Sequence, residues 1–464
     1  MPERAFPLRM TRIAVVVPSS RVREVLVTLA ELGAVDLAGP LGAGEGPALE
    51  ALRRLERHGG AAPTIPTLAP GAPDVEQLER GGASDLLAGE VELERRRASG
   101  VEHGSFALFV GWAPEMTLDQ VGRRLEPLNA SLVLLPAPRR QDPPTLLAPA
   151  RAADPFRPLL DTYGAVPYAD VDPTPFVAIT YCLMFGMMFG DVGDGLVLLA
   201  AALALRASRR PRLAALRRAW PLLAACAGTA ILFGVFYGEL FGPTHVLPTI
   251  WLAPLDDPEK LIAAGLIIGV VLLCLGHAVG IVNRWREGGA RLALTSASAV
   301  PGLLLLLAAA ALTAGVLAGS AFAVIGGGVL VLAALTAVAT GLVAETGRGA
   351  AAAGEVLVGS LETLQRTLSN VLSFTRLAAF GLVHAALGAV VLKGAEALWG
   401  APLPDLAAVL VFALGSSLAF ALEGLVAGVQ ALRLEYYELF SRVFAREGRP
   451  FKPWRLSLLT NEEV

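Results

Sequence analysis

The stretch SNVLSFTRLAAFGLVHAAL (369–387) places an arginine, Arg376, and a histidine, His384, inside a long apolar tract. An arginine at the centre of a bilayer costs about 2.5–3.5 kcal/mol on insertion scales, so its side chain is expected to face protein or a water-filled cavity. An ionisable residue in a tract of this kind is a functional-site hypothesis. The first question is therefore whether the surrounding chain spans a membrane.

The composition predicts that it does. Of the 464 residues, 54% are hydrophobic and only 17% are charged, and the mean hydropathy is +0.59. These values are too apolar for a soluble chain of this length and indicate a multi-span membrane protein. Charge is concentrated in the first part, and the first ten residues lack a signal-peptide core. We therefore expect a cytoplasmic domain over 1–172 and a membrane domain over 173–464.

Charge and cysteine content argue against several classes of function. A net charge of −3 without a basic run argues against a nucleic-acid partner. The cysteines lie in apolar tracts without metal-ligand spacing, so we expect buried thiols and neither a metal nor another cofactor. No G-x-x-x-x-G-K-[ST] loop for a nucleotide is present in the sequence.

Seven apolar tracts are long enough to cross a core of about 30 Å at about 1.5 Å per residue. They cover approximately 175–206, 213–241, 259–283, 291–318, 320–345, 351–399 and 404–446. Basic segments are expected on the cytoplasmic side, and they lie at 206–212, 283–291, 347–349 and 441–455. This pattern fits eight helices and two cytoplasmic termini if the first tract turns back at GDVGDG (190–195). A single kinked helix is the alternative.

The last two tracts are longer than a bilayer core requires, so we expect two long, tilted helices. The predicted fold is therefore mostly α, with a helical membrane domain of about eight transmembrane helices after a small α/β domain. At 100° per residue, polar side chains of the first long tract fall within roughly 40° of one line. They are Glu362, Arg366, Ser369, Ser373, Arg376 and His384. The second long tract has a stripe of Ser416, Glu423 and Gln430, with Arg433 beside it.

Two interpretations of these stripes are open. They could form a closed ion-pair network with a structural role, or a hydrated path for protons. An arginine cannot lose its proton at accessible pH, so it acts as a fixed positive charge and a poor proton carrier. Its expected task is to hold a mobile carboxylate ionised, on another subunit, while it blocks direct proton leakage.

Several segments carry a family pattern. In the membrane part they are DPTPFVAITYCLMFGMMFGDVGDG (172–195), LFGVFYGELFG (232–242), LSFTRLAAFGLVHA (372–385) and LEGLVAGVQALRLEYYELFSRVF (422–444). The first part adds TRIAVVVPSSRVREVLVTLAELGAVDL (11–37) and FVGWAPE (109–115). In this order they resemble the membrane subunit of rotary vacuolar/archaeal-type ATPases, called subunit a in vacuoles and subunit I in bacteria and archaea. Residues 245–350 match only in hydrophobicity.

The resemblance implies roles for single residues. Arg376 matches the essential arginine that faces the carboxylate of the rotor ring, and Arg433 matches a second arginine on the neighbouring helix. Positions associated with two aqueous half-channels are matched by Glu362, His384, Glu423 and Gln430, and Ser369 and Ser373 lie on the same stripe. The other signatures contain Asp191, Asp194 and Glu239, for which a place at a channel mouth and capping of the hairpin turn are both open.

The resemblance also implies an assembly. It predicts a non-catalytic stator subunit of a proton-translocating ATPase or ATP synthase in the bacterial plasma membrane. Its expected partners are the rotor ring of c/K/L-type proteolipids, the peripheral stalk subunits, the central-stalk cap subunit and the lipid bilayer. The rival is a stand-alone secondary transporter with an intramembrane carboxylate–arginine site, which predicts inverted repeats. The sequence shows no internal repeat.

The first domain is predicted as a compact α/β lobe. MTRIAVVVP (10–18) and ASLVLLP (130–136) predict strands, whereas 20–33 and 117–129 predict amphipathic helices. Segments 48–59 and 74–99 predict a short two-helix arm, with a flexible link over 59–73. The family typically has a much longer amino-terminal region with coiled-coil arms. The domain is therefore shortened, and its contact with the stalks is open.

Overall fold

A computed structural model describes residues 6–37, 46–58, 61–138, 142–148, 154–346, 349–399, 405–444 and 446–459. The chain forms two compact units. The sheet unit comprises Phe6–Ala148, Val166–Tyr168 and Gly448–Val464, and the helical unit includes Pro149–Ala165 and Ala169–Glu447. Residues 347–348 of one predicted cytoplasmic loop, 59–60 of the predicted link and residue 445 lie outside the described residues.

The sheet unit is built on an antiparallel sheet with the strand order β2-β5-β1-β6. Strand β1 (Met10–Pro18) pairs along its full length with β5 (Phe106–Pro114) and on its other side with β6 (Ser131–Leu135). The short strands β2 (Asp36–Leu37) and β4 (Val101–His103) also pair with β5. The core residues Ile13, Val15 and Val17 alternate along β1, so the sheet has one apolar face toward the core.

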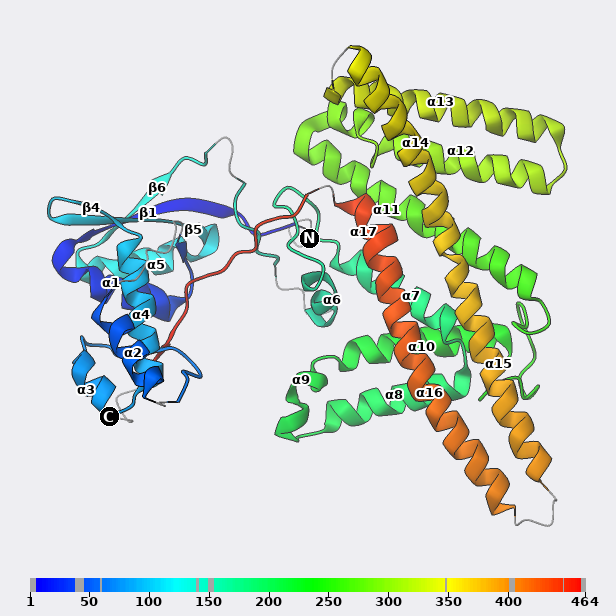
Figure 1. Ribbon diagram of the computed structural model, residues 1–464, viewed down its shortest axis with the longest axis horizontal. Coiled ribbons are helices and arrows are strands. Elements are labelled where there is room, and N and C mark those ends of the chain that lie inside the picture. Colours follow the sequence, from blue (N-terminus) through cyan, green and yellow to red (C-terminus); the bar gives the residue numbers. More distant parts are fainter. Residues whose placement is uncertain are drawn as a thin grey trace. The chain divides into compact units, whose positions relative to one another are not determined.

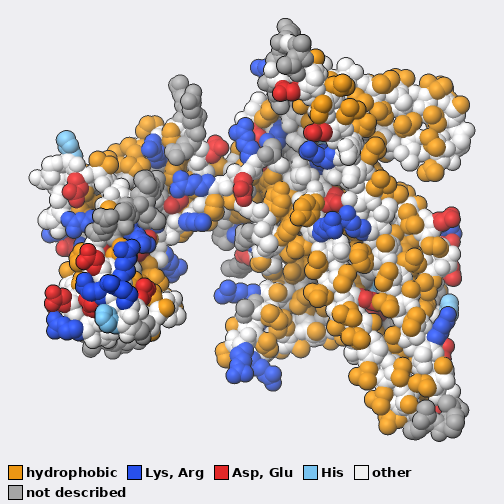
Figure 2. Space-filling model, viewed as in Figure 1, with side chains coloured by type: hydrophobic (Ala, Val, Ile, Leu, Met, Phe, Trp, Pro, Cys, Tyr) orange, Lys and Arg blue, Asp and Glu red, His pale blue; other side chains and the backbone are white. Residues whose placement is uncertain are grey.

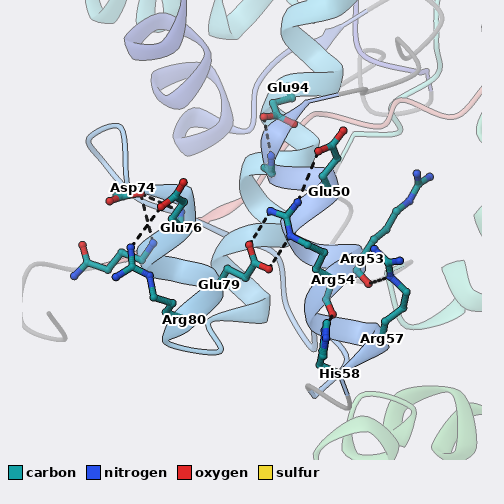
Figure 3. Close-up of polar contacts among 12 residues, drawn as sticks. Glu50, Arg53, Arg54, Arg57, His58, Asp74, Glu76, Glu79, Arg80 and Glu94 are labelled. Atoms are coloured by element: carbon teal, nitrogen blue, oxygen red, sulfur yellow. Dashed lines mark hydrogen bonds and ion pairs between the residues drawn. The ribbon is translucent and has the colours of Figure 1, made fainter.

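Helices α1 (Val22–Leu32) and α5 (Leu118–Leu125) contribute apolar side chains to this core. The predicted strands and amphipathic helices are thus confirmed. The predicted arm is formed by α2 (Pro47–Arg57) and α4 (Ser84–Ala98), which share a small apolar cluster. A short helix, α3 (Val75–Arg80), is tied to α2 because Arg54 donates two hydrogen bonds of 2.8 Å to Glu79, as Figure 3 shows.

The carboxy-terminal tail belongs to the sheet unit, whereas the sequence predicts it as part of the membrane domain. Trp454 is only 5% exposed and lies in the core of the sheet unit. Strand β7 (Ser457–Leu458) pairs in parallel with β3 (Thr67–Leu68), which falls inside the predicted link. The burial of one large aromatic side chain is the physical reason for this placement, and local hydrophobic periodicity does not predict it.

The helical unit has six helices, among the described residues, that are long and apolar enough to cross a membrane. Figure 1 shows them, and Figure 2 shows hydrophobic side chains spread over their outer faces. They are α10 (Trp220–Tyr237), α11 (Pro258–Thr295), α12 (Val300–Leu317), α13 (Ala321–Thr346), the pair α14 (Ala350–Ser373) and α15 (Thr375–Leu398), and α16 (Leu406–Leu434) with its extension α17 (Phe440–Val443). The predicted class, a helical membrane domain with a small α/β domain, is confirmed.

Two shorter helices, α7 (Thr174–Met188) and α8 (Val192–Ala207), form the predicted hairpin. At their junction, the Val192 amide donates to the Glu239 carbonyl, just beyond the end of α10. Away from the junction, Cys182 of α7 contacts Cys226, and Arg206 of α8 lies over the Trp220 ring. Both helices therefore extend from the turn toward the start of α10, so the chain folds back on itself. Among the described residues, the helical unit thus has six helices of spanning length and this hairpin of two shorter ones.

The first of the two long predicted helices is almost continuous. It is interrupted at Phe374, where hydrogen bonds from Phe374 N to Val371 O and from Leu377 N to Phe374 O tighten the turn. Phe374 is fully buried, and its ring occupies the space beside Gly269 of α11. A Cβ on Gly269 would lie only 2.3 Å from Phe374 Cγ. The interruption therefore comes from packing against α11 and not from the glycines of the tract. The last helix contains one π-helical turn, Glu435–Leu439.

Candidate functional site

Two groups of polar side chains lie around α15 and α16, which contribute Arg376, His384 and Glu423. The first, which we call the His384 cluster, consists of Asp191, Asp194, Glu239, His384 and Glu423. The second, the Arg376 cluster, consists of Ser373, Arg376 and Glu438. His384 and Arg376 are eight residues apart on α15, which corresponds to about 12 Å along the helix. The two clusters are therefore separate sites along one pair of apolar helices.

His384 is the centre of the first cluster. Its side chain is 6% exposed, and Nδ1 makes a short hydrogen bond with Glu423 Oε2 on α16. The other ring nitrogen, Nε2, lies 3.9 Å from Asp194 Oδ2. The structure thus brings together three of the predicted site residues from three separate signatures. The helical period places His384 and Glu423 on polar stripes, but only packing of α15 against α16 makes them partners.

Asp191 is fully buried and holds the hairpin turn. Its Oδ1 accepts hydrogen bonds from the amides of Asp194 (3.0 Å) and Phe241 (2.9 Å), and its Oδ2 accepts one from Gly242 (2.7 Å). Asp191 therefore caps α8 and also fixes the loop that follows α10. The capping role that the sequence left open is the role seen for this side chain.

Glu239 is 3% exposed, and its Oε2 accepts no hydrogen bond from any residue in the described part of the chain. One ligand atom each from Glu239, Asp191 and His384 lie within 4.8 Å of one another. A close backbone contact helps to create this arrangement. A Cβ on Gly388 would lie 2.8 Å from the Gly242 Cα, so a glycine is needed for the loop to reach α15 one turn from His384.

Two cavities border the His384 cluster. A small one of about 20 Å³ is lined by Asp194, His384, Ser416 and Glu423 and is large enough for one water molecule. A larger one of about 300 Å³ is lined by Glu239 together with Asp256, Lys393 and Glu396. Glu239 thus stands between the second cavity and His384, which suits a polar path from the surface into the helices.

The Arg376 cluster is more loosely bound. The Arg376 side chain is 28% exposed, and its Nη1 lies 3.6 Å from Glu438 Oε1, which is beyond ordinary hydrogen-bond distance. Its Nη2 donates to Ser373 Oγ at 3.3 Å. Glu438 is 5% exposed, and its Oε2 has no hydrogen-bond partner among the described residues. Arg376 therefore has a carboxylate nearby without a complete ion pair.

Sequence reasoning missed three buried charged residues close to this cluster, namely Glu435, Glu438 and Arg442. Glu435 is fully buried and accepts a hydrogen bond of 2.8 Å from Thr180 Oγ1 on α7. Both glutamates lie on the π-helical turn, and such turns are frequent at functional sites. The charges in LEYYELFSR (434–442) were visible in the sequence, but the π-helical turn that buries them was not.

The remaining predicted residues are not brought into either cluster. Glu362, Arg366, Ser369 and Arg433 are exposed, and Gln430 is half-buried. The predicted stripe is therefore split, because Ser373, Arg376 and His384 turn toward protein while the residues before them on α14 do not. Arg433 lies between Val429 and Tyr437, which are 55% and 70% exposed, so its surroundings on α16 are apolar and uncovered in the single chain.

Comparison with known proteins relates these features to a family. Residues 101–224 match the profile of the V-type ATPase 116kDa subunit family. Over 378 residues the chain is 26% identical to the A-type ATP synthase subunit I of Thermococcus kodakarensis. The aligned region covers 76% of this chain and 54% of that protein. It is 36% identical over 124 residues to the human V-type proton ATPase 116 kDa subunit a 3, covering 25% of this chain and 15% of that protein.

A third relative is the V-type ATP synthase subunit I 2 of Treponema pallidum, which is 44% identical over 87 residues, or 18% of each chain. The chain spans about half the length of the archaeal relatives that it matches. These similarities agree with the order of the signatures and with the helical membrane fold. The chain is therefore similar in sequence to the V-type ATPase 116kDa subunit family over residues 101–224, and to subunit a of a V-type ATPase and subunit I of A-type ATP synthases.

Proposed function

We propose that this chain is the stator ion-channel subunit of a V/A-type rotary ATPase or ATP synthase. In this proposal, protons move through two half-channels to and from a carboxylate on the rotor ring, and Arg376 separates the two. The observation that carries the proposal is the pair of polar clusters around α15 and α16. His384 is buried and paired with Glu423, whereas Arg376 is partly exposed and loosely paired with Glu438. The chain itself needs no catalytic site for this task.

The His384 cluster supports one half-channel. Glu239 borders a cavity of about 300 Å³, and Asp194, His384 and Glu423 border one that is large enough for a single water. Carboxylates, imidazole and water are groups that pass protons over hydrogen-bond distances. Glu239, His384 and Glu423 are therefore proposed as successive proton carriers, with Asp191 as the residue that fixes the surrounding loop.

The Arg376 cluster supports the gate. A guanidinium stays charged at accessible pH, so it cannot relay a proton and repels one. Because Arg376 is 28% exposed and only loosely paired with Glu438, it is able to meet a carboxylate that arrives from outside the chain. That meeting would hold the rotor carboxylate ionised between the two half-channels. Glu438, Glu435 and Gln430 are proposed to lie along the other half-channel.

Arg433 supports the presence of a rotor partner. An exposed arginine on a helix whose neighbours are apolar is costly in lipid, about 2.5–3.5 kcal/mol on insertion scales. A partner surface that carries carboxylates removes this cost. A rotor ring of proteolipid subunits fits this chemistry, and by homology the peripheral stalk subunits and the central-stalk cap subunit complete the proposed assembly.

The proposed location is the plasma membrane, with both termini in the cytoplasm. The hairpin of α7 and α8 makes an even number of apolar helices, so the two ends of the helical unit return to one side. The basic residues of 206–212 and 283–291 favour the cytoplasm for that side. The cavity beside Glu239 would then open on the opposite side.

The test is ATP-driven acidification of vesicles that contain the assembled complex with Arg376→Ala. Incorporation of the subunit is checked by mass spectrometry of the purified complex. We expect loss of pumping with normal assembly. Normal pumping by a fully assembled Arg376→Ala complex would make the arginine a structural residue and would remove the gate from the proposal.

A further inference from the structure

We propose that Asp191, Glu239 and His384 form a binding site for a divalent transition-metal cation of the zinc class. An occupied site would hold the proposed half-channel closed. The binding itself follows from the donor groups alone, whereas the inhibition rests on the proposed function. Neither role was expected from the sequence, because the three residues lie in separate signatures and lack metal-ligand spacing.

The donor set is the first argument. One ligand atom from each residue lies within 4.8 Å of the others, and the residues are 0%, 3% and 6% exposed. Donors around a tetrahedral Zn²⁺ at about 2.1 Å lie roughly 3.4 Å apart, so small side-chain rotations would close the site. Two carboxylates with one imidazole suit zinc and its neighbours, whereas Mg²⁺ prefers oxygen donors and retains its water.

The orientation of His384 is the second argument. Its Nδ1 is engaged by Glu423, which leaves Nε2 to face the acidic groups, with Asp194 Oδ2 at 3.9 Å. A carboxylate that receives the Nδ1 proton fixes the tautomer in which Nε2 carries a free lone pair. This carboxylate–histidine arrangement is the usual support for a metal-ligating histidine. Glu423 would therefore be a positioning residue and not a ligand.

Unused acceptor capacity is the third argument. Glu239 is only 3% exposed, and its Oε2 accepts no hydrogen bond from the described residues. Within the described ranges, Asp191 Oδ2 accepts one hydrogen bond, from the Gly242 amide, which leaves a lone pair for a further partner. A buried carboxylate oxygen without a donor is costly, and a cation at this point would satisfy both side chains.

The cavity of about 300 Å³ provides access to the site. Glu239 is in its wall, and the other charged residues in the wall are Asp256, Glu396 and Lys393. The carboxylates of Glu239, Asp256 and Glu396 outnumber the ammonium group of Lys393, so the cavity wall attracts cations. A metal ion arriving through it would meet Glu239 first and then Asp191 and His384.

The experiment measures metal binding directly on the purified complex. After removal of metals with a chelator, ⁶⁵Zn²⁺ is titrated by equilibrium dialysis in the presence of excess Mg²⁺. We expect one Zn²⁺ per chain of this subunit. His384→Ala and Glu239→Gln should each weaken binding on the order of a hundredfold, and Glu423→Gln by about ten- to a hundredfold. Control variants are His103→Ala and Glu355→Gln, which remove an exposed histidine and an exposed carboxylate elsewhere.

X-ray absorption of the wild-type complex with one bound Zn²⁺ is the second readout, and it does not depend on a variant that must fold. One imidazole nitrogen and carboxylate oxygens in the first shell are expected. An oxygen-only shell, or wild-type affinity in both His384→Ala and Glu239→Gln, overturns the site. Absence of wild-type binding also overturns it, and ATP-driven pumping that still depends on Arg376 would then leave the proposed function intact.

Inhibition is measured separately, as ATP-driven acidification with and without Zn²⁺ on the side of the cavity. Slower acidification in the wild type is expected, reversed by a chelator. Zn²⁺ bound at the site with undiminished acidification would keep the metal site and overturn its place on the proton path.

Discussion

The His384 cluster and the Arg376 cluster use the same two helices but differ in how completely their charges are paired. His384 is buried and bonded to Glu423, with Asp194 and Glu239 close by. Arg376 is partly exposed, and its nearest carboxylate oxygen is 3.6 Å away. The paired side chains of the His384 cluster suit proton transfer between fixed partners. A charged side chain that must bind a partner on another chain cannot be fully ion-paired within its own chain, and Arg376 has this property.

The largest effect that would test this comparison is expected at Glu423. Replacing it by glutamine removes the carboxylate that receives the His384 Nδ1 proton. Pumping should fall on the order of ten- to a hundredfold while assembly stays normal. The measurement is ATP-driven acidification of vesicles, with Glu355→Gln, at an exposed position of α14, as the matched control. Unchanged pumping in both Glu423→Gln and His384→Ala would exclude a half-channel at this cluster.

The next effect concerns the geometry of the His384 cluster. Gly388→Val introduces a Cβ that would lie 2.8 Å from the Gly242 Cα, so the loop after α10 must move away from α15. Overpacking of this kind costs about 1–3 kcal/mol, and we expect a several-fold loss of pumping with a lower melting temperature. Gly394→Val is the control, because the nearest atom to its Cβ is 3.8 Å away. Equal behaviour of the two variants would show that this contact does not shape the site.

A smaller effect on pumping is expected at the Arg376 cluster. Glu438→Gln removes the carboxylate beside Arg376 but leaves the guanidinium free to meet an external partner. Because the two are loosely paired, pumping should fall by only about two- to fivefold. Steady-state acidification rates of Glu438→Gln and Glu423→Gln, measured side by side, decide the point. A complete loss with Glu438→Gln would mean that Arg376 depends on its internal partner, and the contrast between the clusters would fail.

The smallest effect lies outside both clusters, at Asp170 in the segment before α7. Burial, and then the neighbouring Glu287 carboxylate, raise the pKa of Asp170 to about 7. The folded protein therefore binds a proton that the unfolded chain, with a carboxyl pKa of about 3.9, releases. The free energy of unfolding contributed by Asp170 must fall as pH rises from about 4 to about 7.

Melting temperatures of the detergent-solubilised protein, measured between about pH 5 and pH 8, test this sign. Asp170→Asn should flatten the fall seen in the wild type by about one or two degrees. A change of about 1 kcal/mol shifts the melting temperature by roughly 2–4 °C for 150–250 residues and by less for a longer chain. Asp256→Asn, which removes an exposed carboxylate, serves as the control. Parallel curves for wild type and Asp170→Asn would contradict the expected linkage.

Much of the helical unit was predictable because apolar length and loop charge are local properties. The hairpin followed from the glycines and aspartates of 190–195 together with the arginine bias of the loops. The interruption at Phe374 was not predictable, because it depends on a cavity that Gly269 leaves on α11. Trp454 is a similar case, since its burial in the sheet unit follows from a long-range contact and not from a local pattern.

Within the site, the sequence by itself determined which residues carry charge in apolar tracts, and the helical period placed Arg376, His384 and Glu423 on polar stripes. Only the tertiary structure decided the partners. It joined His384 to Glu423, brought Asp191 and Glu239 to the same point, and left Arg376 partly open. The physical reason is that a period of 3.6 residues fixes the face of one helix, whereas contacts between helices depend on close approaches such as Gly242 to Gly388.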